Sequence, residues 1–201
     1  MAVHWGIDDG IALVPIAYPE VVNVGPLTYS LCQKPVLGLV MYIATACTFP
    51  ALFEAEPLPL QQAGMRITRE FKAPVSKPYF LQLGFKFPSS SATRSREIAG
   101  SRYDDNCLRD YADIPEPQKA GLGRPIPIHV LVREKRTGAV VVDRVFTSLC
   151  VTSWSANERQ RTVARFELAA GTYVAEIRNM ENQAGLEDVL TTMSLVPGNG
   201  K

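Results

Sequence analysis

The segment from Lys77 to Phe87, KPYFLQLGFKF, constrains the fold more than any other part of the chain. Every second residue in it is large and apolar, namely Tyr79, Leu81, Leu83, Phe85 and Phe87. Gln82, Gly84 and Lys86 stand between them. Because successive side chains of a β-strand point to opposite faces, this pattern predicts a strand with one buried face.

The same alternation recurs along the rest of the chain. It is found in residues 65–73, 126–134, 139–146, 162–169, 171–179 and 189–196. Arg136-Thr137-Gly138 forms a turn signal between two of these strands, which predicts a hairpin. Seven short strands without alternating helical segments predict an all-β fold, an antiparallel β-sandwich of jelly-roll or immunoglobulin-like type.

One long segment, Ser89–Gly123, breaks the β pattern. It is polar and rich in charge, and a short helix is expected around Cys107 to Tyr111. Long insertions in compact domains are often functional, although a solvated crossover between two sheets would have the same composition.

A second unusual segment is the apolar run from Val36 to Ala46, which follows Lys34 and ends at Cys47. A basic residue followed by a short apolar core is typical of a secretory signal peptide. Ala44-Thr45-Ala46-Cys47 resembles the lipobox of bacterial lipoproteins, in which the cysteine is lipidated, although leucine is usual where Ala44 stands. An uncleaved anchor and a buried helix are the alternatives.

These features predict three parts: a leader at 1–46, a tether at 47–64 and a sandwich domain at 65–197. Residues 1–31 contain acidic residues but no Lys or Arg, which does not suit the start of a signal peptide. We therefore expect the true translation start to lie downstream of the recorded one.

Cysteine usage agrees with export. With Cys32 in the leader and Cys47 lipidated, Cys107 and Cys150 remain. In the oxidising periplasm two remaining cysteines predict a disulfide, and two separate buried thiols are the alternative. A bridge would tie the insertion to the loop expected at Val151–Gln160.

The sequence contains little that indicates catalysis. It has no nucleophile elbow, phosphate-binding loop or zinc-protease motif, and no cofactor is implied. His129 lies mid-strand, where a structural role is expected. The acidic residues Asp104, Asp105, Asp110, Asp113 and Glu116 match no calcium loop, and interspersed arginines favour solvated charges over a metal or acid–base site. No long basic run suggests nucleic acid.

Four residues are candidates for a partner-binding surface: Tyr103, Arg109, Tyr111 and Trp154. Tyrosine, tryptophan and arginine are enriched at binding hot spots because each combines a large contact area with a polar end. The bridge from Cys107 would bring the insertion and the loop at Val151–Gln160 to one edge of the sandwich.

The chain resembles bacterial envelope lipoproteins with a β-sandwich domain of unknown function. The resemblance rests on the lipobox-like leader and on FELAAGTYVAEIRN, which is similar to the closing hairpin of many bacterial sandwich and jelly-roll domains. It implies a non-enzymatic, membrane-anchored protein facing the periplasm that binds a protein partner, with an immunity protein against a secreted toxin as one form. The alternative is a carbohydrate-binding module of the cell envelope, in which exposed aromatic side chains would contact a glycan.

Overall fold

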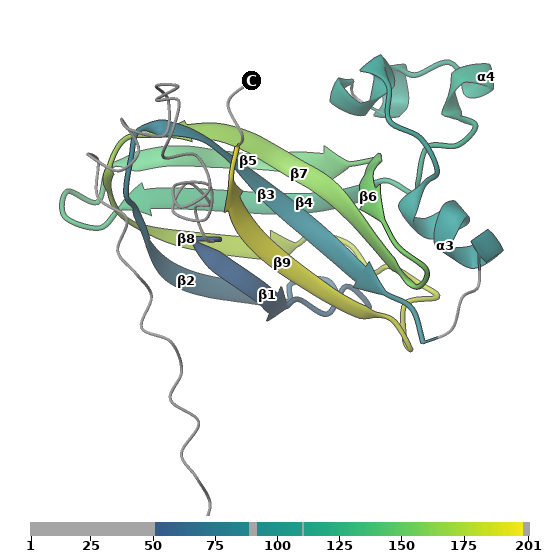
Figure 1. The fold of residues 1–201 in the computed structure, drawn as a ribbon, viewed down its shortest axis with the longest axis horizontal. Helices are drawn as coiled ribbons and strands as arrows, with labels where there is room; N and C mark the ends of the chain where they lie inside the picture. The colour runs from purple at the N-terminus through teal and green to yellow at the C-terminus, as the bar shows by residue number, and fades with distance from the viewer. Residues whose placement is uncertain (1–50, 89–91, 110, 199–201) are drawn as a thin grey trace, which may run out of the picture.

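The structure, a computed structural model, describes residues 51–88, 92–109 and 111–198. Nine β-strands form two antiparallel sheets packed face to face (Figure 1). The strands are β1 (Phe53–Pro57), β2 (Arg66–Ala73), β3 (Lys77–Lys86), β4 (Ile126–Glu134), β5 (Val140–Ser148), β6 (Val151–Trp154), β7 (Glu158–Leu168), β8 (Gly171–Asn179) and β9 (Leu190–Pro197). The predicted β-sandwich is therefore confirmed.

The strand order identifies the sandwich type. The five-stranded sheet has the order β1-β9-β3-β7-β6, and the four-stranded sheet has the order β2-β8-β4-β5. With the short edge strand β6 set aside, the two sheets interleave in sequence as in a jelly roll built from two Greek keys. Of the two sandwich types expected, the topology is the jelly roll.

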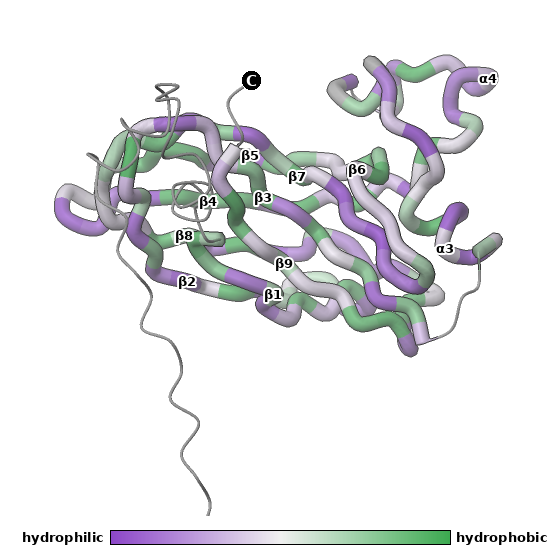
Figure 2. Tube along the Cα trace, in the orientation of Figure 1, coloured by the Kyte–Doolittle hydropathy of each residue, from purple (hydrophilic) through white to green (hydrophobic). Residues whose placement is uncertain are grey.

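The core follows the alternation read from the sequence. The five apolar side chains predicted to face inward are all buried: four come from β3, and the fifth is Phe87, which follows it. The predicted inward-facing side chains of β4, of the second half of β7, of β8 and of β9 are buried as well. Figure 2 shows apolar and polar residues alternating along these strands. The inner faces of both sheets form one hydrophobic core, because a jelly roll can bury each strand only on one side.

Two strands were not predicted, and one of them corrects the proposed tether. Strand β1 lies within residues 47–64 and pairs with β9, and Leu58 and Leu60 behind it are fully buried. The sandwich therefore begins at about Phe53. Strand β6 and the start of β7 occupy the segment expected to be a loop at Val151–Gln160.

The insertion between β3 and β4 is folded. It contains the helix α3 (Ala92–Ala99), the 3₁₀ turns η1 (Asp105–Leu108) and η2 (Tyr111–Asp113), and the single-turn helix α4 (Glu116–Lys119). The short helix expected around Cys107 to Tyr111 is thus two 3₁₀ turns, and α3 was not predicted. In Figure 1 these elements extend from one end of the sandwich, beside β6.

Candidate functional site

A groove at one open edge of the sandwich is the site best supported by the predicted residues. It has a volume of about 540 Å³ and lies where β5 of one sheet passes β7 of the other. We call it the edge groove; its lining residues are Phe80, Tyr103, Cys107, Arg109, Arg144, Val145, Phe146, Thr147, Cys150, Thr162, Val163, Ala164 and Arg165.

Only two of the four predicted partner-binding residues line this groove. Tyr103 is 63% exposed, and Arg109 is also exposed, so both present their side chains at the wall that the insertion forms. Tyr111 instead packs, half-buried, against a small core in the insertion, with the Lys119 amine 4.6 Å from its ring centroid. Its role is therefore structural.

Trp154 lies elsewhere. It is 68% exposed at the end of β6 and borders a separate hollow of about 420 Å³ on the outer face of the five-stranded sheet. It pairs with Arg159, which in turn pairs with the inward-facing Phe85. Ser153 and Gln160 line the same hollow as Trp154, whereas Tyr103 and Tyr111 do not. The prediction that Trp154 shares one edge with Tyr103 and Tyr111 is not supported.

The edge groove carries positive charge. Among the described residues, its lining includes three arginines and no aspartate or glutamate. The Arg144 guanidinium lies 4.6 Å from the ring centroid of Phe146, and that of Arg165 lies 5.9 Å from the ring centroid of Phe80. Guanidinium groups over aromatic faces form flat surfaces that bind carboxylates while contacting apolar groups.

Carboxylates among the described residues neutralise little of the charge of Arg109 and Arg165. Arg109 donates to the side-chain oxygen of Asn106 at 3.3 Å and to the backbone carbonyl of Asp113 at 3.1 Å, which are both neutral acceptors. Arg165 has a carboxylate partner, Glu167 at 3.4 Å, but both side chains are exposed, and such pairs are weak. An anionic group entering the groove would therefore meet little competition.

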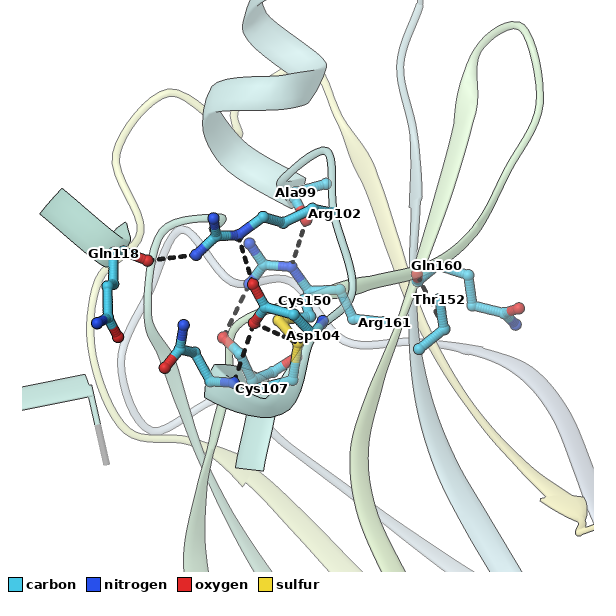
Figure 3. The surroundings of a disulfide bond; sticks show 11 residues. Ala99, Arg102, Asp104, Cys107, Gln118, Cys150, Thr152, Gln160 and Arg161 are labelled. Carbon is cyan, nitrogen blue, oxygen red and sulfur yellow. Dashed lines mark hydrogen bonds and ion pairs between the residues drawn. A yellow bond between two sulfur atoms is a disulfide. The ribbon is translucent and has the colours of Figure 1, made fainter. Parts of the chain in front are cut away.

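A disulfide ties the insertion wall to the sandwich. Cys107 in η1 and Cys150, just before β6, are bridged with their Cα atoms 5.5 Å apart (Figure 3). This confirms the predicted pair. Around it, Ile114, Leu122 and Leu149 form a second small core. The disulfide and this small core thus hold the wall that carries Tyr103 and Arg109 against the sandwich.

The carboxylate beside this disulfide has a structural role. Asp104 accepts a hydrogen bond from the backbone N–H of Asn106 at 2.9 Å and so caps η1. Its other oxygen lies 3.0 Å from Nε of Arg102, whose guanidinium also donates to the carbonyl of Gln118 (Figure 3). Among the described residues no group of three or more potential metal ligands occurs, and the side chains of Asp105 and Asp110 lie outside this description.

A fully buried arginine joins the insertion to both sheets. Arg161 on β7 is 0% exposed, and among the described residues its guanidinium donates to four backbone carbonyls and to no carboxylate. Nε donates to Ala99 at 2.9 Å, Nη1 to Arg124 at 2.8 Å and to Ser148 at 2.9 Å, and Nη2 to Ile98. Ile98 and Ala99 end α3, where unpaired carbonyls and the helix dipole favour a cation.

Sequence reasoning missed Arg161 because the phase of β7 changes. A bulge on β7 opposite Leu81 and Gln82 places one extra residue, Val163, in the strand. Counting back from the buried Ala164 at period two predicts that Thr162 faces inward. The bulge turns Arg161 inward instead.

Arg161 stays charged despite its burial. Burial, with a smaller contribution from the nearby charge of Arg124, lowers the pKa of the Arg161 guanidinium to about 9, so it remains a cation at neutral pH. Gly123 is required beside it, because a Cβ there would lie 1.6 Å from Nη2 of Arg161. The chain therefore reserves this space for the guanidinium.

We expect replacing both Cys107 and Cys150 by alanine to lower the free energy of unfolding by about 4 kcal/mol. The bridge closes a sequence separation of 43 residues, and the cost follows from the chain entropy that an unbridged unfolded state regains. Urea unfolding followed by circular dichroism measures it. Reduction of the wild-type protein should produce a similar change; a loss below about 1 kcal/mol in both would show that the bridge contributes little.

Comparison with known proteins agrees with the fold. A family model described as "Domain of unknown function (DUF5625)" matches residues 55–197, which include all nine strands except the first two residues of β1. The chain belongs to the DUF5625 family. The family match thus covers the insertion, the edge groove and both bridged cysteines. No curated protein matches the chain.

A solved structure supports the same architecture. The crystal structure of a protein from Sulfurospirillum deleyianum matches with a TM-score of 0.55 and 18% sequence identity, covering 73% of this chain and 98% of the other. At this identity the likeness concerns the fold alone.

The described residues contain no helix that is long and apolar enough to cross a membrane. Cys47 and the apolar run before it lie outside the described residues.

Proposed function

We propose that this DUF5625 protein is a non-enzymatic lipoprotein, anchored through Cys47 and facing the periplasm, that binds a protein partner in the edge groove. The observation that carries the proposal is the groove itself. One wall, with Tyr103 and Arg109, is held by the disulfide and by the bonds of Arg161, and the opposite wall is formed by β5. A rigid surface with exposed aromatic and arginine side chains is typical of a binding site.

An immunity protein that blocks a secreted toxin is one form this function can take. Such a protein must bind tightly and be ready before the toxin arrives, and a rigid binding surface favours both. A gene for a secreted toxin beside this one would favour that form. The alternative, a carbohydrate-binding module, would use the exposed aromatic rings of Tyr103 and Trp154, which border two separate hollows.

The partner can be identified by photo-crosslinking in cells. A photoreactive amino acid at Thr147, an exposed groove residue on β5, should give a protein adduct. Thr68, exposed on β2 and outside the groove, is the matched control and should give none. Adducts at Thr68 but not at Thr147 would place the interface elsewhere, and a glycan as the only ligand recovered would favour the carbohydrate module.

We expect Arg109→Glu and Arg165→Glu each to weaken binding of the cross-linked partner by about tenfold. Each change replaces an attraction with a repulsion at an exposed site, and hydrogen bonds to charged groups contribute about 1.5–3 kcal/mol. Isothermal titration calorimetry measures the effect. Arg133→Glu, an exposed change on β4 outside the groove, should bind like the wild type; equal losses in all three variants would indicate only a long-range charge effect.

Tyr103→Ala should cost at least about 2 kcal/mol of binding free energy if its ring is a hot spot. The side chain is exposed, so the variant should keep the stability of the wild type. Binding that is unchanged in Tyr103→Ala would remove this residue from the interface.

Lipidation at Cys47 is expected to anchor the protein in the cell envelope. Labelled palmitate should enter the wild type and be absent from Cys47→Ala, because only a cysteine at that position can accept the lipid. Both proteins should be produced in equal amounts, which immunoblotting checks. Label retained by Cys47→Ala would contradict this assignment.

A further inference from the structure

The free edge of β7 is the part of the edge groove that most limits what can bind there. β3 pairs with β7 along its whole length, from Glu158 to Leu168. On the other side β6 pairs only with Arg159 to Arg161. Within the described residues no strand pairs with the remaining seven residues on that side, Thr162 to Leu168.

This free edge exposes hydrogen-bonding groups of the backbone. Alternate residues of a strand direct their N–H and C=O groups to opposite sides, so part of the Thr162–Leu168 backbone faces the groove. No backbone hydrogen bond joins this side to another segment of the described chain. Seven residues extend over about 23 Å, which is enough for a strand of ordinary length.

The neighbouring strand β5 does not fill this position. Among the described strands it pairs only with β4, in the other sheet, although it passes close to β7. The space between them remains as the edge groove, in which Arg144 and Phe146 come from β5 and Phe80 and Arg165 from the five-stranded sheet.

The charge of the groove selects the chemistry of an added strand. Arg165 lies on the outer face of the five-stranded sheet, where it pairs with Phe80, and Arg144 lies on the β5 side. A strand between them would have one arginine near each of its faces. Acidic side chains on such a strand would meet a guanidinium on either face, and apolar ones would contact Phe80 and Phe146.

We propose that the partner contributes an extended, acidic segment that adds to the free edge of β7 as a β-strand. This rests on the proposed function and specifies its binding mode. Main-chain hydrogen bonds to Thr162–Leu168 provide the affinity, and the arginines select acidic side chains. Such arginines can also protect an edge strand from aggregation, and the experiment below separates the two roles.

The experiment pans the full-length chain against a phage-displayed library of random linear peptides. The selected peptides should be rich in Asp and Glu alternating with apolar residues. Arg144→Glu and Arg165→Glu should each weaken their binding by at least about tenfold. N-methylation of alternate backbone amides in a selected peptide should abolish binding, whereas methylation of the intervening amides should have little effect.

Hydrogen exchange provides a second readout at the site. Binding of a selected peptide should slow exchange at alternate amides between Thr162 and Leu168. The inference is overturned if no peptide is selected, if the peptides are not acidic, or if N-methylation is tolerated at every position. Arg144→Ala or Arg165→Ala proteins that self-associate but bind the peptides unchanged would show that the arginines only protect the edge.

The two proposals can fail separately. A partner cross-linked at Thr147 whose binding is unaffected by the acidic peptides would leave the proposed function intact and overturn the strand-addition mode. If acidic peptides bind the edge but no protein is cross-linked in cells, the proposed function is contradicted. Addition of an acidic strand to the free edge of β7 is then still supported.

Discussion

Arg161→Met is expected to lower the free energy of unfolding by about 4 kcal/mol. Methionine has a similar length and removes a buried charge, which by itself would stabilise the fold. It also removes the guanidinium donor from the backbone carbonyls of Ala99, Arg124 and Ser148. The Ile98 carbonyl loses the same donor but still accepts the backbone N–H of Arg124 at 3.1 Å. Each unsatisfied buried acceptor costs about 1–3 kcal/mol, so the loss outweighs the gain.

Urea unfolding measures this effect, with Arg165→Met as the matched control on the same strand. Arg165 is exposed and makes only a weak surface ion pair, so its replacement should change stability by less than about 0.5 kcal/mol. In Arg161→Met we also expect faster proteolysis within the insertion than in the sandwich, because α3 and Arg124 lose their attachment. Equal stability of the two variants would mean that water replaces the guanidinium at no cost.

Phe85→Ala is expected to cost about 3–5 kcal/mol, the range for removal of a buried aromatic side chain. Phe85 is 1% exposed at the centre of the core, with its ring centroid 6.5 Å from that of Phe87 and 5.5 Å from the Arg161 guanidinium. The substitution leaves a cavity and removes the aromatic face beside the buried cation. Because domains have only about 5–15 kcal/mol of stability, a large unfolded fraction near physiological temperature would follow.

Lys86→Ala is the control for this variant. Lys86 neighbours Phe85 on β3 but faces outward, and its ion pair with Glu158, at 3.6 Å, is exposed. Its replacement should be nearly neutral. A sensitive Lys86 and a tolerant Phe85 would mean that β3 has the opposite phase, and calorimetric unfolding of both proteins decides this.

Arg161 and the disulfide both support the wall of the edge groove. Arg161 holds the end of α3 and the segment at Arg124, while the disulfide holds η1, so the wall of the edge groove is attached at two places. Loss of either attachment should weaken partner binding without altering any groove side chain. Binding measured in Cys107→Ala/Cys150→Ala at a temperature where the sandwich remains folded separates the wall's contribution from that of the strands.

The sequence alone determined the sandwich, because alternation is a local property of each strand. Tyr79 to Phe87 repeat at period two, and that period suffices to predict which face is buried. The pairing of Cys107 with Cys150 also followed, because only two cysteines remained once Cys32 and Cys47 were assigned to the leader and the lipid site.

Only the tertiary structure decided how the edge groove is composed. Tyr103 and Arg109 reach it, whereas Tyr111 and Trp154 do not, because their positions depend on the fold of the insertion and on the pairing of β6 with β7. Strand β1 was missed because its pairing with β9 joins segments more than 130 residues apart. Arg161 was hidden by a bulge, whose extra residue reverses the phase of β7. Long-range pairing and bulges depend on contacts between distant segments, and local periodicity carries no information about them.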